Sequence, residues 1–135
     1  MLFSLTIALL INCNNKKSEQ NSVIEKLAGT WIWIESSGGI DGSTTKAANE
    51  NVALIEFGKD GTYRVFINGK EKEKTGFSLS QGKSIYSGDS AWLIKYGSSG
   101  QISPITQSIM FKGQDTLFLN DECNDCMISA YKRKK

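Results

Sequence analysis

The chain has 135 residues, enough for one folded domain with a single core and too few for two. Its 16 Lys and Arg residues stand against 14 Asp and Glu, a formal net charge of +2, and they are mostly interleaved, so no basic stripe indicates nucleic-acid binding. The lack of histidine removes the usual base of a serine or cysteine triad, and no glycine-rich phosphate loop or spaced metal-ligand cluster is present. We therefore expect a protein that is not an enzyme and uses no metal or cofactor.

An uncharged, mostly apolar run occupies residues 1–12 and ends abruptly at Cys13, after which the chain is polar. The run is shorter than the roughly 20 residues of a membrane-spanning helix, but it suits the apolar part of an export signal. Residues 10–13, Leu-Ile-Asn-Cys, resemble the lipobox of bacterial lipoproteins. The resemblance implies a signal peptide over residues 1–12, a lipidated Cys13, and a membrane-anchored protein of the bacterial cell envelope, with the outer membrane expected. The alternative is that residues 2–11 form a buried strand or helix and Cys13 is an ordinary core thiol.

The polar residues 13–25 are expected to form a flexible tether, which leaves residues 26–135 as the folded domain. From Leu27 onward, β-branched and aromatic runs alternate with clusters of Gly, Asn, Asp and Ser, and helical periodicity is almost absent. This pattern predicts strands over residues 29–36, 52–57, 62–68, 76–80, 84–86, 91–96, 105–112, 116–120 and 127–132.

Tight-turn signals separate many of these strands. Asp60-Gly61 and Asn68-Gly69 are strong signals, and residues 112–115 and 97–100 are weaker ones. Successive strands joined by hairpins close most simply into an up-and-down barrel. The sequence therefore predicts an all-β fold, a single antiparallel barrel of eight to nine strands, with a two-sheet sandwich as the alternative. The long polar stretch over residues 36–51 breaks the hairpin pattern, and we expect it to act as a lid.

Two cysteines near the carboxyl end, Cys123 and Cys126, are separated by two residues and lie between strand-like runs. In an exported chain, a disulfide is the default interpretation of such a pair. Free thiols, or a metal or redox site, are the alternatives. A redox pair of this spacing normally opens a helix, and a zinc site needs two further ligands, which no histidine here can supply.

Several short motifs resemble the lipocalin family, and more closely the small bacterial lipocalin-like lipoproteins. They are Gly29-Thr-Trp31, residues 57–63 (Phe-Gly-Lys-Asp-Gly-Thr-Tyr), residues 115–119 (Asp-Thr-Leu-Phe-Leu) and Tyr131-Lys-Arg133. The resemblance covers residues 26–133 and implies a calycin-type barrel, in which Arg133 packs across Trp31. A guanidinium over an indole face would also close one barrel end on physical grounds alone. Both residues are therefore expected to be structural.

Strand alternation, with Trp31 set inward, predicts an aromatic barrel lining. The side chains that we expect to reach a ligand are Trp33, Glu35, Tyr63, Trp92, Tyr96 and Gln107. The sequence favours a monomeric, membrane-anchored barrel that binds a small hydrophobic or amphipathic molecule. The alternative is a non-enzymatic envelope lipoprotein with a filled barrel that acts as an interaction or structural module. The two hypotheses differ in whether the barrel lumen is open.

Overall fold

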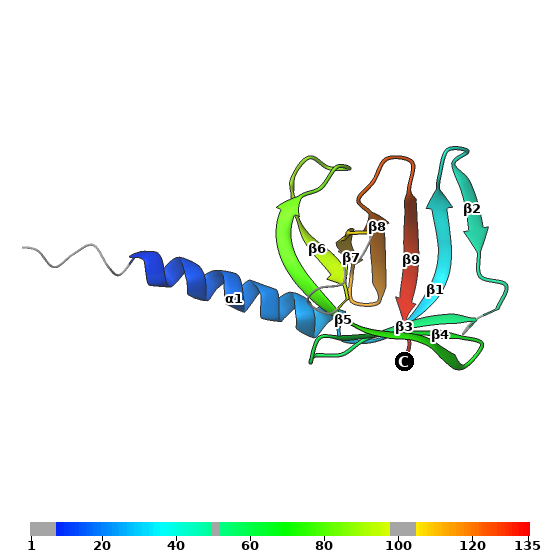
Figure 1. Ribbon diagram of the computed structural model, residues 1–135, viewed down its shortest axis with the longest axis horizontal. Helices are drawn as coiled ribbons and strands as arrows, with labels where there is room; N and C mark the ends of the chain where they lie inside the picture. The colour runs from blue at the N-terminus through cyan, green and yellow to red at the C-terminus, as the bar shows by residue number, and fades with distance from the viewer. Residues whose placement is uncertain (1–7, 50–51, 98–104) are drawn as a thin grey trace, which may run out of the picture.

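The computed structural model describes residues 8–49, 52–97 and 105–135, with side chains from Cys13 onward. In these described residues, one helix, α1 (Ala8–Leu27), precedes nine strands (Figure 1). The strands are β1 (Gly29–Gly38), β2 (Ser43–Lys46), β3 (Ala53–Phe57), β4 (Thr62–Ile67), β5 (Lys70–Lys83), β6 (Ser90–Tyr96), β7 (Gln107–Lys112), β8 (Thr116–Asp121) and β9 (Met127–Arg133).

Eight of the strands form a closed antiparallel barrel, which confirms the predicted all-β, up-and-down fold. The strands follow chain order from β3 to β9, and the ring closes because β1 pairs with both β3 and β9. The ninth strand, β2, is an extension outside this ring. It pairs with the second half of β1, whereas β3 pairs with the first half, so both share one edge of β1. The closed barrel is consistent with a lipocalin-like fold.

The long polar stretch that the sequence predicts as a lid is built differently. Its described part, residues 36–49, forms a hairpin in which β2 lies beside β1 (Figure 1). The backbone N–H of Ala47 continues the pairing by donating to the carbonyl of Ile34 at 2.8 Å. This segment therefore extends the sheet instead of forming an irregular loop. The prediction missed β2 because Ser43–Lys46 is short, polar and exposed on every residue.

Turn chemistry explains how neighbouring strands are joined. Asn68 and Gly69 have φ of 50° and 77°, the left-handed values that a two-residue hairpin turn requires at both central positions. Between β3 and β4, the Asp60 carboxylate accepts a hydrogen bond from the backbone N–H of Thr62 at 3.0 Å. The predicted turn at residues 112–115 is also present, with Gly113 at a φ of 65°. Residues 98–100 of the fourth predicted turn lie outside the described residues.

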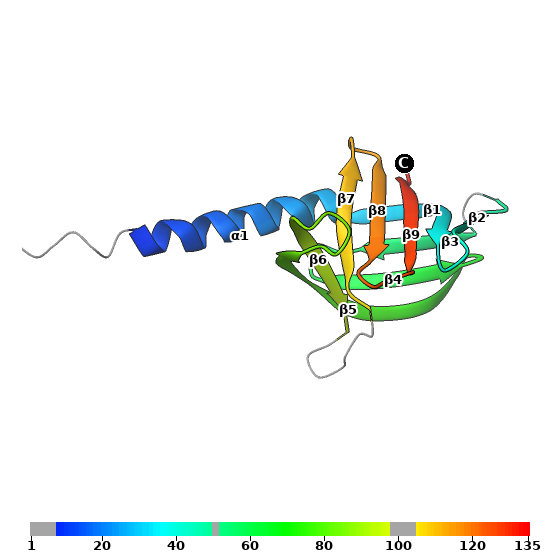
Figure 2. The same ribbon diagram turned by 90° about the horizontal axis from the view of Figure 1, so that it is seen from above.

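Strand β5 bends so that it belongs to two parts of the barrel. Its residues 70–76 pair with β4, and residues 77–83 pair with β6. In Figures 1 and 2, β3 and β4 cross beneath the strands β6 to β9, and β5 curves from one group to the other. The predicted strand over residues 76–80 is thus only the middle of a strand of 14 residues. The predicted strand over residues 84–86 is wrong, because these residues begin the turn between β5 and β6.

The carboxyl-terminal part of α1 closes one end of the barrel. Leu27 is fully buried there, and Val23 and Ile24 pack against the same core. The other fully buried large side chains come from the strands and are Trp31, Phe57, Ile94, Leu117 and Leu119. The flexible tether predicted over residues 13–25 is not what the structure shows, because all of these residues lie within α1. This segment contains Lys, Glu and Gln, good helix formers, and neither Gly nor Pro.

Arg133 joins the end of β9 to the end of α1. Its guanidinium carbon lies 4.1 Å from the centre of a Trp31 ring. The same guanidinium donates hydrogen bonds to the backbone carbonyls of Ala28, at 3.0 Å, and Lys26, at 2.7 Å. The final carbonyls of a helix lack partners within the helix and carry partial negative charge, so a cation is well suited to this place. Arg133 therefore caps α1 and covers the indole that the sequence predicts as its partner.

Candidate functional site

Polar side chains gather on the inner face of the barrel beyond its buried core. We call this group the tyrosine site and define it as Tyr63, Tyr96, Gln107, Asp121 and Tyr131. Its members come from five different strands, β4, β6, β7, β8 and β9. Each is partly exposed, whereas the core side chain Trp31 has 0% of its surface exposed. Solvent therefore reaches the tyrosine site, while Leu27 of α1 is fully buried in the core.

Strand register places these residues on one face. Ile94 of the buried core lies opposite Gln107, and Gln107 in turn lies opposite Asp121. Residues directly opposite each other on adjacent strands point to the same side of a sheet. Gln107 and Asp121 therefore share the inner face with Ile94. The same reasoning places Tyr131 inward, because it lies opposite Leu117, another buried core residue.

The aromatic rings of the site are in direct contact. The ring centres of Tyr63 and Tyr96 are 4.5 Å apart, and those of Tyr63 and Phe57 are 5.1 Å apart. Phe57 belongs to the buried core, so the tyrosine rings continue the apolar packing outward. Aromatic pairs at these separations contribute roughly 0.5–1.5 kcal/mol beyond their buried area. The rings therefore have fixed positions from which their hydroxyl groups act.

A chain of two short hydrogen bonds crosses the site. The Tyr96 hydroxyl donates to Oε1 of Gln107 at 2.6 Å, and Nε2 of Gln107 donates to Oδ1 of Asp121 at 2.7 Å. An ionised carboxylate can only accept hydrogen bonds, so the nitrogen of the Gln107 amide must face Asp121 and its oxygen must face Tyr96. The direction of the whole chain is therefore fixed.

Burial is the main cause of shifted pKa values in the tyrosine site. The pKa of Tyr131 is raised to about 12, chiefly by burial; a hydrogen bond with Ser129 acts to lower it and the nearby Asp121 charge acts to raise it. The pKa values of Tyr63 and Tyr96 are also raised, first by burial and then by neighbouring tyrosines and acidic groups, which include Glu73 for both rings. All three phenols are accordingly neutral hydrogen-bonding groups at physiological pH.

A bulge in β1 changes which residues face the lumen. Trp33 lies opposite Tyr131, but Glu35 lies opposite Ala130, so the register shifts by one residue between them. Because Tyr131 and Ala130 are adjacent on β9, they point to opposite faces. Glu35 therefore lies on the outer face, and the prediction that it lines the lumen is wrong. A bulge reverses the face to which the side chains after it point, and no sequence pattern predicts the bulge in β1.

Ser36 takes the inner position that was predicted for Glu35. Its Oγ lies 2.7 Å from Oγ of Ser129, and it accepts a hydrogen bond from Nε1 of Trp33 at 2.9 Å. Trp33 thus lies beside Tyr131, at the margin of the tyrosine site. Trp92, also predicted to line the lumen, is partly buried and packs against the core from β6. Of the six predicted lining residues, Tyr63, Tyr96 and Gln107 are brought into direct contact.

Sequence reasoning missed Asp121 and Tyr131 as site residues. Asp121 begins the acidic run over residues 121–125 (Asp-Glu-Cys-Asn-Asp), a composition that is typical of a solvated turn. In the sequence, Tyr131 belongs to the closing motif with Arg133, which predicts a structural role. Its position could have been found by strand alternation, because it lies two residues before an inward-facing arginine. Asp121 could not have been found in this way without the register of β7 against β8.

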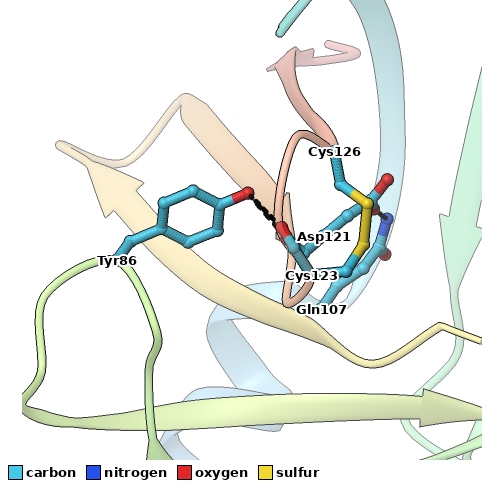
Figure 3. The surroundings of a disulfide bond; sticks show 5 residues. All are labelled: Tyr86, Gln107, Asp121, Cys123 and Cys126. Atoms are coloured by element: carbon cyan, nitrogen blue, oxygen red, sulfur yellow. Dashed lines mark hydrogen bonds between the residues drawn. A yellow bond between two sulfur atoms is a disulfide. The ribbon is translucent and has the colours of Figure 1, made fainter. Parts of the chain in front are cut away.

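The turn between β8 and β9 holds the backbone next to Asp121 in place. Cys123 and Cys126 form a disulfide, which confirms the predicted bridge, and Figure 3 shows it beside Gln107 and Asp121. Tyr86 reaches across from the β5–β6 turn, and its hydroxyl lies 2.8 Å from the Asp121 carbonyl and 3.3 Å from the Cys123 carbonyl (Figure 3). The backbone that carries Asp121 is therefore held by a covalent bridge and by a neighbouring turn.

Glu122 ties these two turns together. Its carboxylate accepts hydrogen bonds from the Ser84 hydroxyl at 2.8 Å and from the backbone N–H of Ile85 at 2.7 Å. Hydrogen bonds from Ser108, Ile85 and Ser84 lower the pKa of Glu122, although desolvation on burial, the largest single contribution, acts to raise it. Glu122 of this acidic turn therefore holds the β8–β9 turn to the β5–β6 turn, and it is not simply a solvated charge.

A pocket lies apart from the tyrosine site, beside β1 and β2. It has a volume of about 310 Å³ and lies between β1 and the residues that follow β2. The pocket is lined by Ile32, Trp33, Ile34, Ala47, Ala48, Asn49 and Lys132.

Cys13, the predicted lipidation site, is a free and exposed thiol on α1, which projects away from the barrel (Figure 1). Within residues 8–49, 52–97 and 105–135, no helix is long and apolar enough to cross a membrane. In the same part of the chain, no three His, Cys, Asp or Glu residues are grouped so that they could hold a metal ion.

Comparisons of this chain with models of protein families, with curated proteins and with solved structures return no match.

Proposed function

We propose that this protein is a membrane-anchored lipoprotein of the bacterial cell envelope whose barrel binds a small amphipathic molecule. The observation that carries the proposal is the hydrogen-bonded chain from Tyr96 through Gln107 to Asp121, on the inner face of a barrel whose buried core is apolar. Filling a small barrel requires only apolar side chains, and a carboxylate inside a barrel costs free energy unless it is well hydrogen-bonded. Ligand sites, by contrast, combine mostly apolar walls with a few fixed polar groups.

The burial pattern supports binding at one side of the barrel. The core beside α1 is solid, with Leu27, Trp31 and Leu117 each at 0% exposure. The tyrosine site beyond it is partly exposed. A ligand would therefore rest its apolar part on the aromatic rings and direct a polar group towards Gln107 and Asp121. The lipobox resemblance and the exposed Cys13 support the membrane anchor.

The filled core also favours a second candidate function. Eight buried side chains form one hydrophobic cluster in the barrel, which is the packing expected of a rigid scaffold. In that case the protein would act through its outer surface as an interaction or structural module, and the exposed apolar side chains Ile34 and Met110 would contribute to contact. Both candidates are non-enzymatic.

Native mass spectrometry of protein purified from its own membrane distinguishes the two candidates. The proposed function predicts a small molecule that is retained by the folded protein and released on unfolding. A complementary titration uses a fatty-acid-like probe and an aromatic probe, with quenching of tryptophan fluorescence as the signal. Protein that carries no small molecule and shows no saturable response to either probe would contradict ligand binding and favour the interaction module.

A further inference from the structure

We propose that the tyrosine site recognises a protonated amine carried on a small apolar body. This inference rests on the ligand-binding function proposed above and names the chemical class of the ligand. It is argued from the direction of the hydrogen bonds, from the aromatic faces and from the sign of the charges around the site.

The hydrogen-bonded chain leaves acceptors facing the lumen. The proton of the Tyr96 hydroxyl is used on Gln107, and one N–H of Gln107 is used on Asp121. The Tyr96 oxygen keeps its lone pairs, and the Asp121 carboxylate has about four acceptor positions, of which Gln107 takes one. A ligand that satisfies these groups must supply hydrogen-bond donors. A carboxylate or phosphate headgroup would instead meet Asp121 with a like charge.

The aromatic rings suit a cation equally well. Tyr63 and Tyr96 are held against each other with ring centres 4.5 Å apart, and Tyr131 and Trp33 lie opposite each other on neighbouring strands. A cation over a Tyr or Trp face is attracted by the negative face of the ring, by about 0.5–2 kcal/mol depending on how far it is desolvated. An ammonium group can therefore contact aromatic faces and a carboxylate at the same time.

The charged groups that act on the three phenols are acidic. Asp121 acts on Tyr96 and Tyr131, and Glu73 acts on Tyr63 and Tyr96. Glu73 lies on β5 opposite Val65, which packs against the core, so its side chain leaves the strand on the inner face. Two carboxylates near neutral phenols create a negative potential, which favours a cationic ligand over a neutral or anionic one of the same shape.

The test compares three probes that share one phenyl ring and a short spacer: 2-phenylethylammonium, 2-phenylethanol and 3-phenylpropionate. Each is titrated into the full-length protein at pH 7 by isothermal titration calorimetry. We expect the ammonium probe to bind at least tenfold more tightly than the alcohol, and the carboxylate probe to bind more weakly than the alcohol. This comparison uses the unmodified protein, so it does not depend on whether any variant folds.

A matched pair of variants then locates the charge. Asp121→Asn keeps an acceptor for Gln107 and removes the charge, so it should weaken ammonium binding at least tenfold and change alcohol binding by less than twofold. Asp125→Asn removes the same charge from an exposed position in the same turn, and its φ of 54° is one that Asn tolerates. This control variant should change neither affinity by more than twofold.

Three other outcomes would contradict the amine proposal, and each differs from the others in what it implies for ligand binding. If the alcohol or carboxylate probe binds as tightly as the ammonium probe, the amine proposal is wrong and the ligand-binding function stands. Equal losses of ammonium affinity in the two variants would indicate a general surface-charge effect instead of this site. If none of the three probes binds, the amine proposal is wrong, and the ligand-binding function falls with it only if native mass spectrometry also finds no retained molecule.

Discussion

Trp31 is the residue at which the helix, the first strand and the last strand are held together. Its indole N–H donates to the Leu27 carbonyl at 2.8 Å, near the end of α1. Arg133 covers one of its rings from β9 and donates to the carbonyls of Ala28 and Lys26. Loss of this indole would leave a cavity and an unpaired carbonyl at the same place.

We therefore expect Trp31→Ala to lower the free energy of unfolding by about 3–5 kcal/mol, the usual cost of truncating a buried large aromatic residue. Trp92→Ala is the matched control, because Trp92 is only partly buried and should cost less. Urea denaturation of the two variants and the parent protein measures both effects. A loss below about 1 kcal/mol for Trp31→Ala would contradict the role assigned to this residue.

Tyr131 makes stability depend on alkaline pH. Its pKa is about 12 in the folded protein, against the ordinary value of 10.0. A phenol whose pKa is raised by folding contributes its full stability below pH 10, and this contribution is lost as the pH rises through 10 towards 12. The expected loss is about 1 kcal/mol by pH 11. Denaturation curves at pH 9, 10 and 11 should show a shallower decline for Tyr131→Phe than for the parent protein. Identical declines would show that the Tyr131 phenol does not cause the effect.

At the scale of strands and turns, the sequence predicts the features that depend on residues close together in the chain. The Asn68-Gly69 turn and the order of hairpins follow from residues adjacent in the chain, so the barrel could be predicted. The first half of β5 could not, because residues 70–74 alternate Lys and Glu and carry no apolar side that marks a strand. The outward position of Glu35 depends on a bulge, and the contact of Gln107 with Asp121 depends on the pairing of β7 with β8. Neither is a property of any single segment.

The β8–β9 turn connects the disulfide to the tyrosine site. Closing the short loop between Cys123 and Cys126 should stabilise the fold by about 2 kcal/mol on the loop-entropy estimate. The double variant Cys123→Ser, Cys126→Ser should lose about this amount in urea denaturation. It should also weaken binding of the ammonium probe, because Asp121 lies two residues before Cys123. Alkylation before and after reduction provides the control. Two thiols that react without reduction in freshly isolated protein would contradict the bridge.

At the scale of the whole molecule, α1 both packs on the barrel core and extends away from the barrel. The side chains of Val23, Ile24 and Leu27 pack on the core, and α1 continues away from the barrel towards Cys13 (Figures 1 and 2). At 1.5 Å per residue, the helix from Cys13 to Leu27 is about 21 Å long. If Cys13 carries the lipid, this helix is a spacer that holds the barrel away from the bilayer surface, and the tyrosine site stays open to small molecules in the surrounding solution.

This arrangement predicts that the anchor and the barrel can be separated by one substitution. Cys13→Ser should release the full-length protein from membranes into the soluble fraction, because it removes the thiol to which the proposed lipid would attach. Stability should change by less than about 0.5 kcal/mol, the usual range for an exposed position away from the core. Binding of the ammonium probe should be unchanged.

Membrane fractionation and intact-mass measurement test the prediction. A Cys13→Ser protein that partitions with membranes as the parent does, or a parent protein with an unmodified cysteine, would show that the membrane association, if any, arises elsewhere in the chain.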